Sequence, residues 1–99
     1  MNDNAPMDTE VASVAQPWRP RLIGLFRLQW EPAQSAHVLL YPEGMVKLNT
    51  SAAQILLRCD GTREMSSLIA DLEKTFNATG LTSDVANFVD HAKTRGWLE

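Results

Sequence analysis

Residues 38–61 read VLLYPEGMVKLNTSAAQILLRCDG, and the spacing of their apolar residues changes midway from two to about 3.6. The first part, Ala36–Tyr41, is a β-rich run, and the Tyr41-Pro42-Glu43-Gly44 sequence after it favours a type I turn. Met45–Leu48 then reads as a short strand. A helical stripe follows and ends at Asp60-Gly61; its members are Ala52, Ile55, Leu56 and Cys59. The stretch therefore predicts a β-hairpin that leads directly into a helix.

The segment before the hairpin has the alternation of another strand. Its apolar face carries Leu22, Gly24, Phe26, Leu28 and Trp30. Residues 31–35 are mostly polar and contain Pro32, so they predict a hairpin loop. Three strands joined by short turns indicate an antiparallel meander.

Two further helical stripes follow the first helix. One spans Met65–Phe76 and is closed by Asn77–Gly80; the other runs from Val85 to Ala92. The expected N-caps are Asn49, Thr50 or Ser51 for the first helix and Thr82 or Ser83 for the third, and Trp97-Leu98 is expected to fold back as an apolar clamp. Helices this short are stable only when packed on one another and on a sheet. The predicted fold class is α+β: a three-stranded antiparallel sheet followed by three helices, a winged-helix-like arrangement.

Length and composition indicate one small globular domain. The 99 residues are 44% hydrophobic and 21% charged. Residues 1–20 are polar and contain three prolines, which predicts a disordered or loosely docked tail before a domain at 21–99. Within the tail, Trp18 is expected to pack on the sheet, with contact to a partner or a second copy as the alternative. A homodimer by strand or arm exchange is left open.

Location is predicted from what the sequence contains near its start and in its apolar runs. No run approaches the roughly 20 residues of a membrane span, and residues 1–10 lack the pattern of a secretory signal. The single cysteine, Cys59, cannot form an intramolecular disulfide. We expect a cytoplasmic protein without contact to a membrane.

The residues that could carry catalysis do not converge. Cys59 lies on an apolar stripe, where burial raises the pKa of a thiol. His37 and His91 have no second His or Cys at metal-ligand spacing, and no glycine cluster could cradle a phosphate. The sequence therefore predicts no enzyme activity, no metal and no cofactor.

A winged-helix DNA-binding protein is the first alternative. The N-terminal residues of the third helix would then contact bases, and they are Thr82, Ser83, Asp84 and Asn87. An acidic residue there and a net charge of −3 disfavour contact with phosphates. We expect no nucleic-acid partner.

Peptide capture fits the pattern better. A third strand at the edge of a meander presents unpaired N–H and C=O groups to which an extended peptide can add. On the third helix, Phe88, His91 and Arg95 fall at helical spacing and could form a groove wall. Lys47 is either an edge charge that prevents aggregation or a partner for an acidic side chain, and Phe88 is equally compatible with core packing. A proline at Val46 is expected to remove a pairing donor and abolish binding.

Several motifs together resemble the PqqD family over about residues 20–98. They are VLLYPEG at 38–44, LN at 48–49, SAAQIL at 51–56, CDGTR at 59–63, and Trp30 with its strand. Glu64-Met65 departs from the family pattern at the start of the second helix. The resemblance implies a cofactor-free carrier that binds the precursor peptide PqqA by strand addition and presents it to PqqE, a radical S-adenosylmethionine enzyme. The peptide-binding residues that it implies are Met45, Val46, Lys47, Leu48, Phe88, His91 and Arg95. An adaptor that docks onto an enzyme without a peptide is the second alternative.

Overall fold

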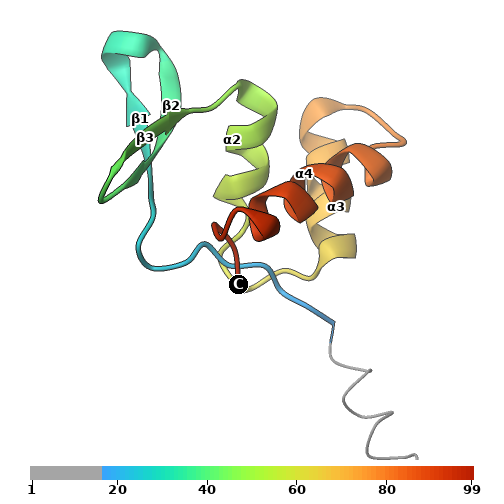
Figure 1. The fold of residues 1–99 in the computed structure, drawn as a ribbon. Helices are drawn as coiled ribbons and strands as arrows, with labels where there is room; N and C mark the ends of the chain where they lie inside the picture. Colours follow the sequence, from blue (N-terminus) through green and yellow to red (C-terminus); the bar gives the residue numbers. More distant parts are fainter. Residues whose placement is uncertain (1–16) are drawn as a thin grey trace, which may run out of the picture.

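The computed structural model describes residues 17–99 and has the predicted α+β architecture (Figure 1). The three strands form one antiparallel sheet of order β1-β2-β3, and three helices follow in the chain. Figure 1 shows the sheet at one side of the molecule, with α2 between it and the other two helices. The elements are β1 (Arg27–Glu31), the short 3-10 helix η1 (Pro32–Gln34), β2 (Ala36–Tyr41), β3 (Gly44–Lys47), α2 (Thr50–Leu57), α3 (Met65–Phe76) and α4 (Thr82–Thr94).

The central hairpin follows the sequence closely. β2 has the predicted bounds, and Pro42 and Glu43 both have negative φ angles, as a type I turn requires. β3 differs by one residue at each end, since it starts at Gly44 and ends at Lys47 rather than Leu48. Leu39 is paired with Leu28 on one side and with Val46 on the other, which places the three side chains in one row.

The strand predicted from Leu22 onward is wrong in its first half, because β1 begins only at Arg27. Arg21 and Leu22 instead form isolated bridges to Asp60 and Leu98. The backbone N–H of Arg21 donates to Glu99 O (3.0 Å), and that of Ile23 donates to Trp97 O (2.8 Å). Only the start of the predicted strand is bridged, to residues near Cys59 and to the C-terminal segment rather than to the sheet. Residues 23–26 form a turn instead, in which the N–H of Phe26 donates to Ile23 O at 2.9 Å. The predicted fold-back of Trp97-Leu98 is confirmed.

The helix ends show which of the predicted capping residues cap a helix in the structure. Asn49 caps α2, since its Oδ1 accepts the N–H of Ala52 at 2.8 Å. The prediction of a Thr82 or Ser83 cap for α4 is wrong: Leu81 occupies the N-cap position and has no side-chain cap bond. The N–H of Leu81 donates to Glu73 Oε2 at 3.0 Å, so a carboxylate from α3 ties down this loop. Asn77, at φ 51°, ends α3 in the left-handed conformation.

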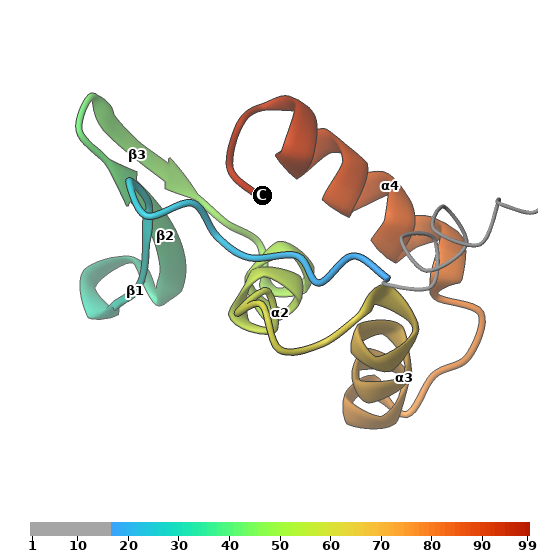
Figure 2. The ribbon, with the colours of Figure 1, turned by 90° about the horizontal axis from the view of Figure 1, so that it is seen from below.

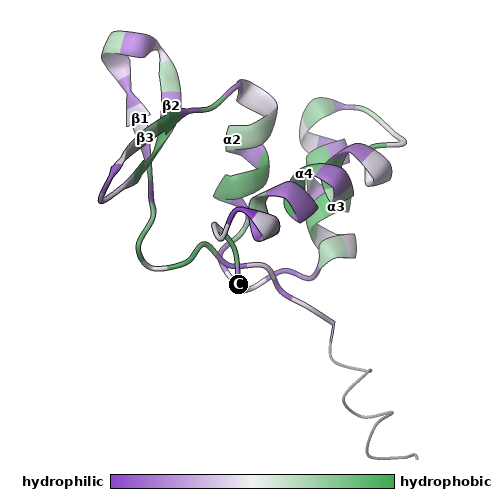
Figure 3. Ribbon diagram, in the orientation of Figure 1, coloured by the Kyte–Doolittle hydropathy of each residue, from purple (hydrophilic) through white to green (hydrophobic). Residues whose placement is uncertain are grey.

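One apolar core lies between the helices and a single face of the sheet. Its fully buried members include Leu39, Leu68, Leu72 and Ala92. Figure 3 shows green, hydrophobic segments on α2 and β2 and purple, hydrophilic segments along the outer side of α4. Trp30 lies on the same sheet face as Leu39 but is 52% exposed and packs edge-on against His37, with ring centroids 5.2 Å apart. The core therefore covers one face of the sheet and leaves its edges open.

Candidate functional site

β3 forms an open edge of the sheet. It pairs with β2 on one side, and no other strand of residues 17–99 pairs with it on the other. Figure 2 shows that β3 is the strand nearest α4, whereas β1 lies at the far edge. A chain that added to β3 would therefore lie on the α4 side of the sheet.

The register decides which backbone groups of this edge are free. The N–H of Leu48 donates to His37 O at 3.0 Å, so Leu48 and His37 form a hydrogen-bonded pair. Such pairs alternate along antiparallel strands, so Val46 also exchanges its bonds with Leu39, its partner in the register. The N–H and C=O groups of Met45 and Lys47 consequently point away from β2, toward the open edge.

This alternation, in which every second residue of β3 faces the open edge, corrects two expectations. Leu48 does not belong to the free row, because its N–H is already paired and its side chain, 6% exposed, lies in the core. A proline at Val46 would break the β2–β3 ladder itself rather than remove a donor for a guest. Within the predicted row of residues 45–48, the structure leaves Met45 and Lys47 as the outward-facing positions.

Phe88, His91 and Arg95 lie on one flank of α4. Successive helical residues are about 100° apart, which places these three together and Lys93 on the opposite flank. Trp18 occupies that opposite flank, with the Lys93 Nζ atom 4.8 Å from the centroid of its ring. The expectation that Trp18 packs on the sheet is therefore wrong, because the chain at residues 17–20 runs beside α4.

The structure does not bring Phe88 and His91 of α4 and its C-cap residue Arg95 into one cavity. Phe88 is half-buried and lines an apolar pocket of about 330 Å³ between α2, α3 and α4. His91 is exposed and lines a different surface pocket with Asn87, Asp90 and Thr94. Arg95 is exposed near Trp97, with its guanidinium carbon 5.8 Å from the ring centroid.

Sequence reasoning missed most of the lining of the apolar pocket. Besides Phe88, its lining residues are Asn49, Ser51, Ala52, Ile55, Leu72, Phe76, Ala78, Leu81, Asp84 and Val85. The one available signal was Phe76 at the end of the second helical stripe, where a large aromatic residue stands beside the polar turn 77–80.

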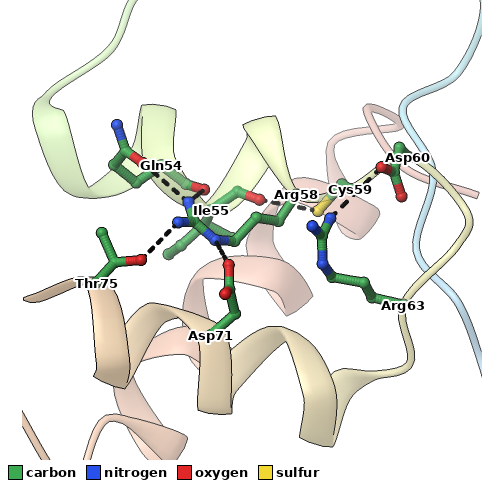
Figure 4. A network of polar contacts seen from close by, with 8 residues as sticks. All are labelled: Gln54, Ile55, Arg58, Cys59, Asp60, Arg63, Asp71 and Thr75. Atoms are coloured by element: carbon green, nitrogen blue, oxygen red, sulfur yellow. Dashed lines mark hydrogen bonds and ion pairs between the residues drawn. The ribbon is translucent and has the colours of Figure 1, made fainter.

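A polar network centred on Arg58 holds α2 against α3 (Figure 4). The Nη1 group of Arg58 donates to Gln54 O at 2.8 Å and to Gln54 Oε1 at 2.9 Å, and its Nη2 group donates to Thr75 Oγ1 at 2.9 Å. Its Nε group donates to Asp71 Oδ2 in an ion pair. The hydrogen bond from Arg58 lowers the pKa of Asp71. The network thus fixes two helices that form walls of the apolar pocket.

Cys59, one of the groups considered for catalysis, is enclosed in the core. Cys59 is buried, and its Sγ donates to Ile55 O at 3.3 Å. Burial, followed by the negative charge of Asp60, raises the pKa of this thiol from 9.0 to about 12. The thiol is therefore protonated at neutral pH, as its place on the apolar stripe predicts.

Two kinds of feature are absent from residues 17–99. No three His, Cys, Asp or Glu side chains are grouped as metal ligands would be. None of the helices in this part of the chain is both long and apolar enough to cross a membrane.

Comparisons with known proteins agree on one family. The family described as coenzyme PQQ synthesis protein D (PqqD) matches residues 36–98. Two relatives, each described as a PqqA binding protein, are 52% identical to this chain. The one from Stutzerimonas stutzeri aligns over 75% of this chain and 82% of its own length. The one from Azotobacter vinelandii aligns over 81% and 88%.

A solved structure has the same fold. It is the PqqD truncation of Methylobacterium extorquens PqqCD, described as a functional, stand-alone RiPP recognition element. It superposes with a TM-score of 0.64 at 27% identity and covers 81% of this chain and 87% of its own.

A small two-layer α+β domain with an open strand edge beside a helix is the architecture of a peptide-recognition domain. The matched residues and the relatives identify which one. The chain belongs to the PqqD family.

Proposed function

We propose that this chain binds the PqqA peptide for PQQ biosynthesis by adding it as a fourth strand to β3, and that it presents the bound peptide to the radical S-adenosylmethionine enzyme PqqE. The names of the 52% identical relatives support PqqA as the peptide. The chain then acts as a cytoplasmic carrier without chemistry of its own, and the protonated thiol of Cys59 is consistent with that role.

The observation that carries the proposal is the outward row of Met45 and Lys47 at an edge that faces α4. Two residues with free N–H and C=O groups offer up to four hydrogen bonds to an extended guest. Each such bond contributes about 0.5–1.5 kcal/mol net, so a guest that also loses conformational entropy needs side-chain contacts as well. Phe88, His91 and Arg95 on the facing flank of α4 are our candidates for these contacts.

The test is a pair of proline variants at the two edges of the sheet. In β1, Leu28 and Trp30 are the outward-facing positions by the same alternation, because their partners Leu39 and His37 bond to β3. Lys47→Pro and Trp30→Pro therefore each remove one outward N–H and leave the sheet's own ladder intact. We expect Lys47→Pro to weaken binding of a synthetic PqqA peptide at least tenfold in calorimetry, and Trp30→Pro to change it less than twofold.

Both variants must first show the circular dichroism spectrum of the wild-type fold. Equal affinities of the two folded variants for PqqA would contradict pairing at β3. For the enzyme step, we expect PqqE to modify PqqA slowly with Lys47→Pro and normally with Trp30→Pro. If PqqE modified PqqA at the wild-type rate with Lys47→Pro, presentation to the enzyme would not depend on pairing at β3, and that part of the proposal would be contradicted.

We also propose that residues 21–99 are the binding domain and residues 1–20 a tail. Residues 1–16 lie outside the part of the chain that the structure describes, whereas Trp18 contacts α4 on the flank away from Phe88. A chain without residues 1–17 should bind PqqA with unchanged affinity. A loss of affinity in that truncation would place the tail in the site.

A further inference from the structure

The apolar pocket begins just beyond the end of β3. Asn49, which lines its mouth, is two residues after Lys47 in the chain. Ala52 and Ile55 of α2, Leu72 and Phe76 of α3 and Phe88 of α4 form much of the rest. Its volume of about 330 Å³ is at the lower end of the range found for small-ligand pockets. Position and size suit a side chain rather than a whole cofactor.

The pocket is preformed. The bonds of Arg58 to Gln54 and Thr75 fix α2 relative to α3. The bond from the Leu81 N–H to Glu73 Oε2, at 3.0 Å, fixes the loop before α4, and the N–H of Ala78 donates to Glu73 O at 2.9 Å. An occupant would therefore not have to order these walls when it binds.

The pocket also leaves apolar surface uncovered. Phe76 is 42% exposed and Phe88 is half-buried, although both pack beside buried core residues. Covering such surface is favourable by about 25 cal/mol per Å². The carboxylate of Asp84 at the pocket disfavours an acidic occupant, because the two negative charges would repel.

The open edge and the pocket lie within reach of one extended peptide. A strand advances about 3.3 Å per residue, so a guest paired with Met45 and Lys47 needs only two or three more residues to reach Asn49 and the pocket mouth. The same guest would thus use its backbone at β3 and a side chain at the pocket. The lining of the apolar pocket includes no residue of β1. Trp30 of β1 lines a different and more polar pocket, between the sheet and α2.

We infer that this pocket is a specificity site that receives one bulky apolar side chain, aliphatic or aromatic, from the bound peptide, two or three residues beyond the position paired with Lys47. The inference rests on the proposed function and adds a side-chain requirement to it. It predicts that the guest is selected by an apolar anchor outside the paired stretch.

The experiment fills the pocket without touching the strand. Ala78→Phe places a ring in the pocket, and Ala86→Phe is the matched control, because Ala86 is exposed on α4 and does not line the pocket. We expect Ala78→Phe to weaken binding of synthetic PqqA at least tenfold and Ala86→Phe to change it less than twofold. Ala78→Leu is a milder variant for the case that the phenylalanine disturbs the fold, and a three- to tenfold loss is expected of it.

A scan of the peptide completes the test. Replacing each bulky apolar residue of PqqA by alanine should identify one whose loss weakens binding to the wild type at least tenfold but adds less than twofold in Ala78→Phe. If the folded Ala78 variants bind PqqA like the wild type, the pocket inference is overturned while pairing at β3 stands. If the wild type does not bind PqqA, both proposals fall. A further outcome would also overturn the pocket inference: Lys47→Pro weakens PqqA binding, and every alanine variant of the peptide loses as much affinity for Ala78→Phe as it loses for the wild type.

Discussion

The two edges of the sheet have the same backbone and different neighbours. β1 leaves Leu28 and Trp30 facing outward, and β3 leaves Met45 and Lys47. β3 faces α4 and ends beside the apolar pocket, whereas β1 leads into η1, and none of the three helices lies beyond it in the described structure (Figure 2). Unpaired backbone groups accept almost any extended chain, so the side chains opposite an edge decide whether it becomes a selective site.

The largest expected effect comes from truncating a core residue of β2, the strand that pairs with both edge strands. Leu39 is fully buried in the middle strand, between Leu28 and Val46. Leu39→Ala should lower the free energy of unfolding by about 2–5 kcal/mol, through lost apolar burial and the cavity that remains. Leu40→Ala is the control, since Leu40 is half-buried on the opposite face of the sheet and should lose clearly less. Equal losses in urea denaturation would show that both faces of the sheet are packed alike.

A second, intermediate effect tests which residues of β3 bond to β2 and which face outward. Val46→Pro removes an N–H that pairs with Leu39, whereas Lys47→Pro removes one that faces outward. A buried hydrogen bond broken on one side costs about 1–3 kcal/mol. Val46→Pro should therefore reduce the free energy of unfolding by at least about 1 kcal/mol more than Lys47→Pro. The reverse order in denaturation experiments would mean that the register is shifted by one residue.

A third prediction concerns the helical layer, whose core residues contact Leu28 of β1 as well as Val46 of β3. The pKa of Cys59 is raised to about 12 in the folded state by burial and Asp60, against 9.0 for an ordinary thiol. Between these values only the unfolded thiol ionises, so the stability linked to Cys59 is complete below pH 9 and declines as the pH rises above it. The free energy of unfolding of the wild type should fall more steeply from pH 9 to 11 than that of Cys59→Ala. Parallel profiles would show that the thiol ionises freely in the folded protein.

The smallest effect is expected at the surface of the same layer. The hydrogen bond from Arg58 lowers the pKa of Asp71, so this carboxylate stabilises the fold above its ordinary pKa of 3.8, and the effect is lost as the pH falls below that value. Asp71→Asn should slightly lower the midpoint of thermal unfolding at pH 7, and this difference from wild type should shrink as the pH falls below 3.8. If α2 and α3 shift as a result, PqqA affinity at β3 should fall as well. A difference from wild type that stays constant as the pH falls would point to packing instead of charge.

Local sequence patterns predicted those elements well whose paired residues lie nearby in the sequence. β2 and the type I turn follow from residues 36–44, because a two-residue hairpin leaves its strands few registers. The stripe from Met65 to Phe76 has the bounds of α3. The combined motifs in residues 38–63 were sufficient to indicate the PqqD family, which the comparisons confirm.

Errors arose where the partner is distant in sequence. Leu22 has the alternation of a strand but pairs with Leu98, and Trp18 packs beside Lys93 rather than the sheet. Thr82 looked like a helix cap, but Glu73 of the preceding helix fixes the loop instead. In each case the sequence showed a residue able to make a contact and could not show which distant group would receive it.

The sequence by itself thus determined three strands, three helices and a hairpin whose last strand could accept a peptide, because periodicity and turn residues act over short distances. Only the tertiary structure decided that Met45 and Lys47 face outward, that Leu48 is a core residue, and that Phe76 and Phe88 meet at one pocket. Which residues of a strand face outward depends on the residues paired with them across the ladder, and a pocket depends on the packing of three helices. Both are set by non-local contacts, which the order of residues along one segment does not contain.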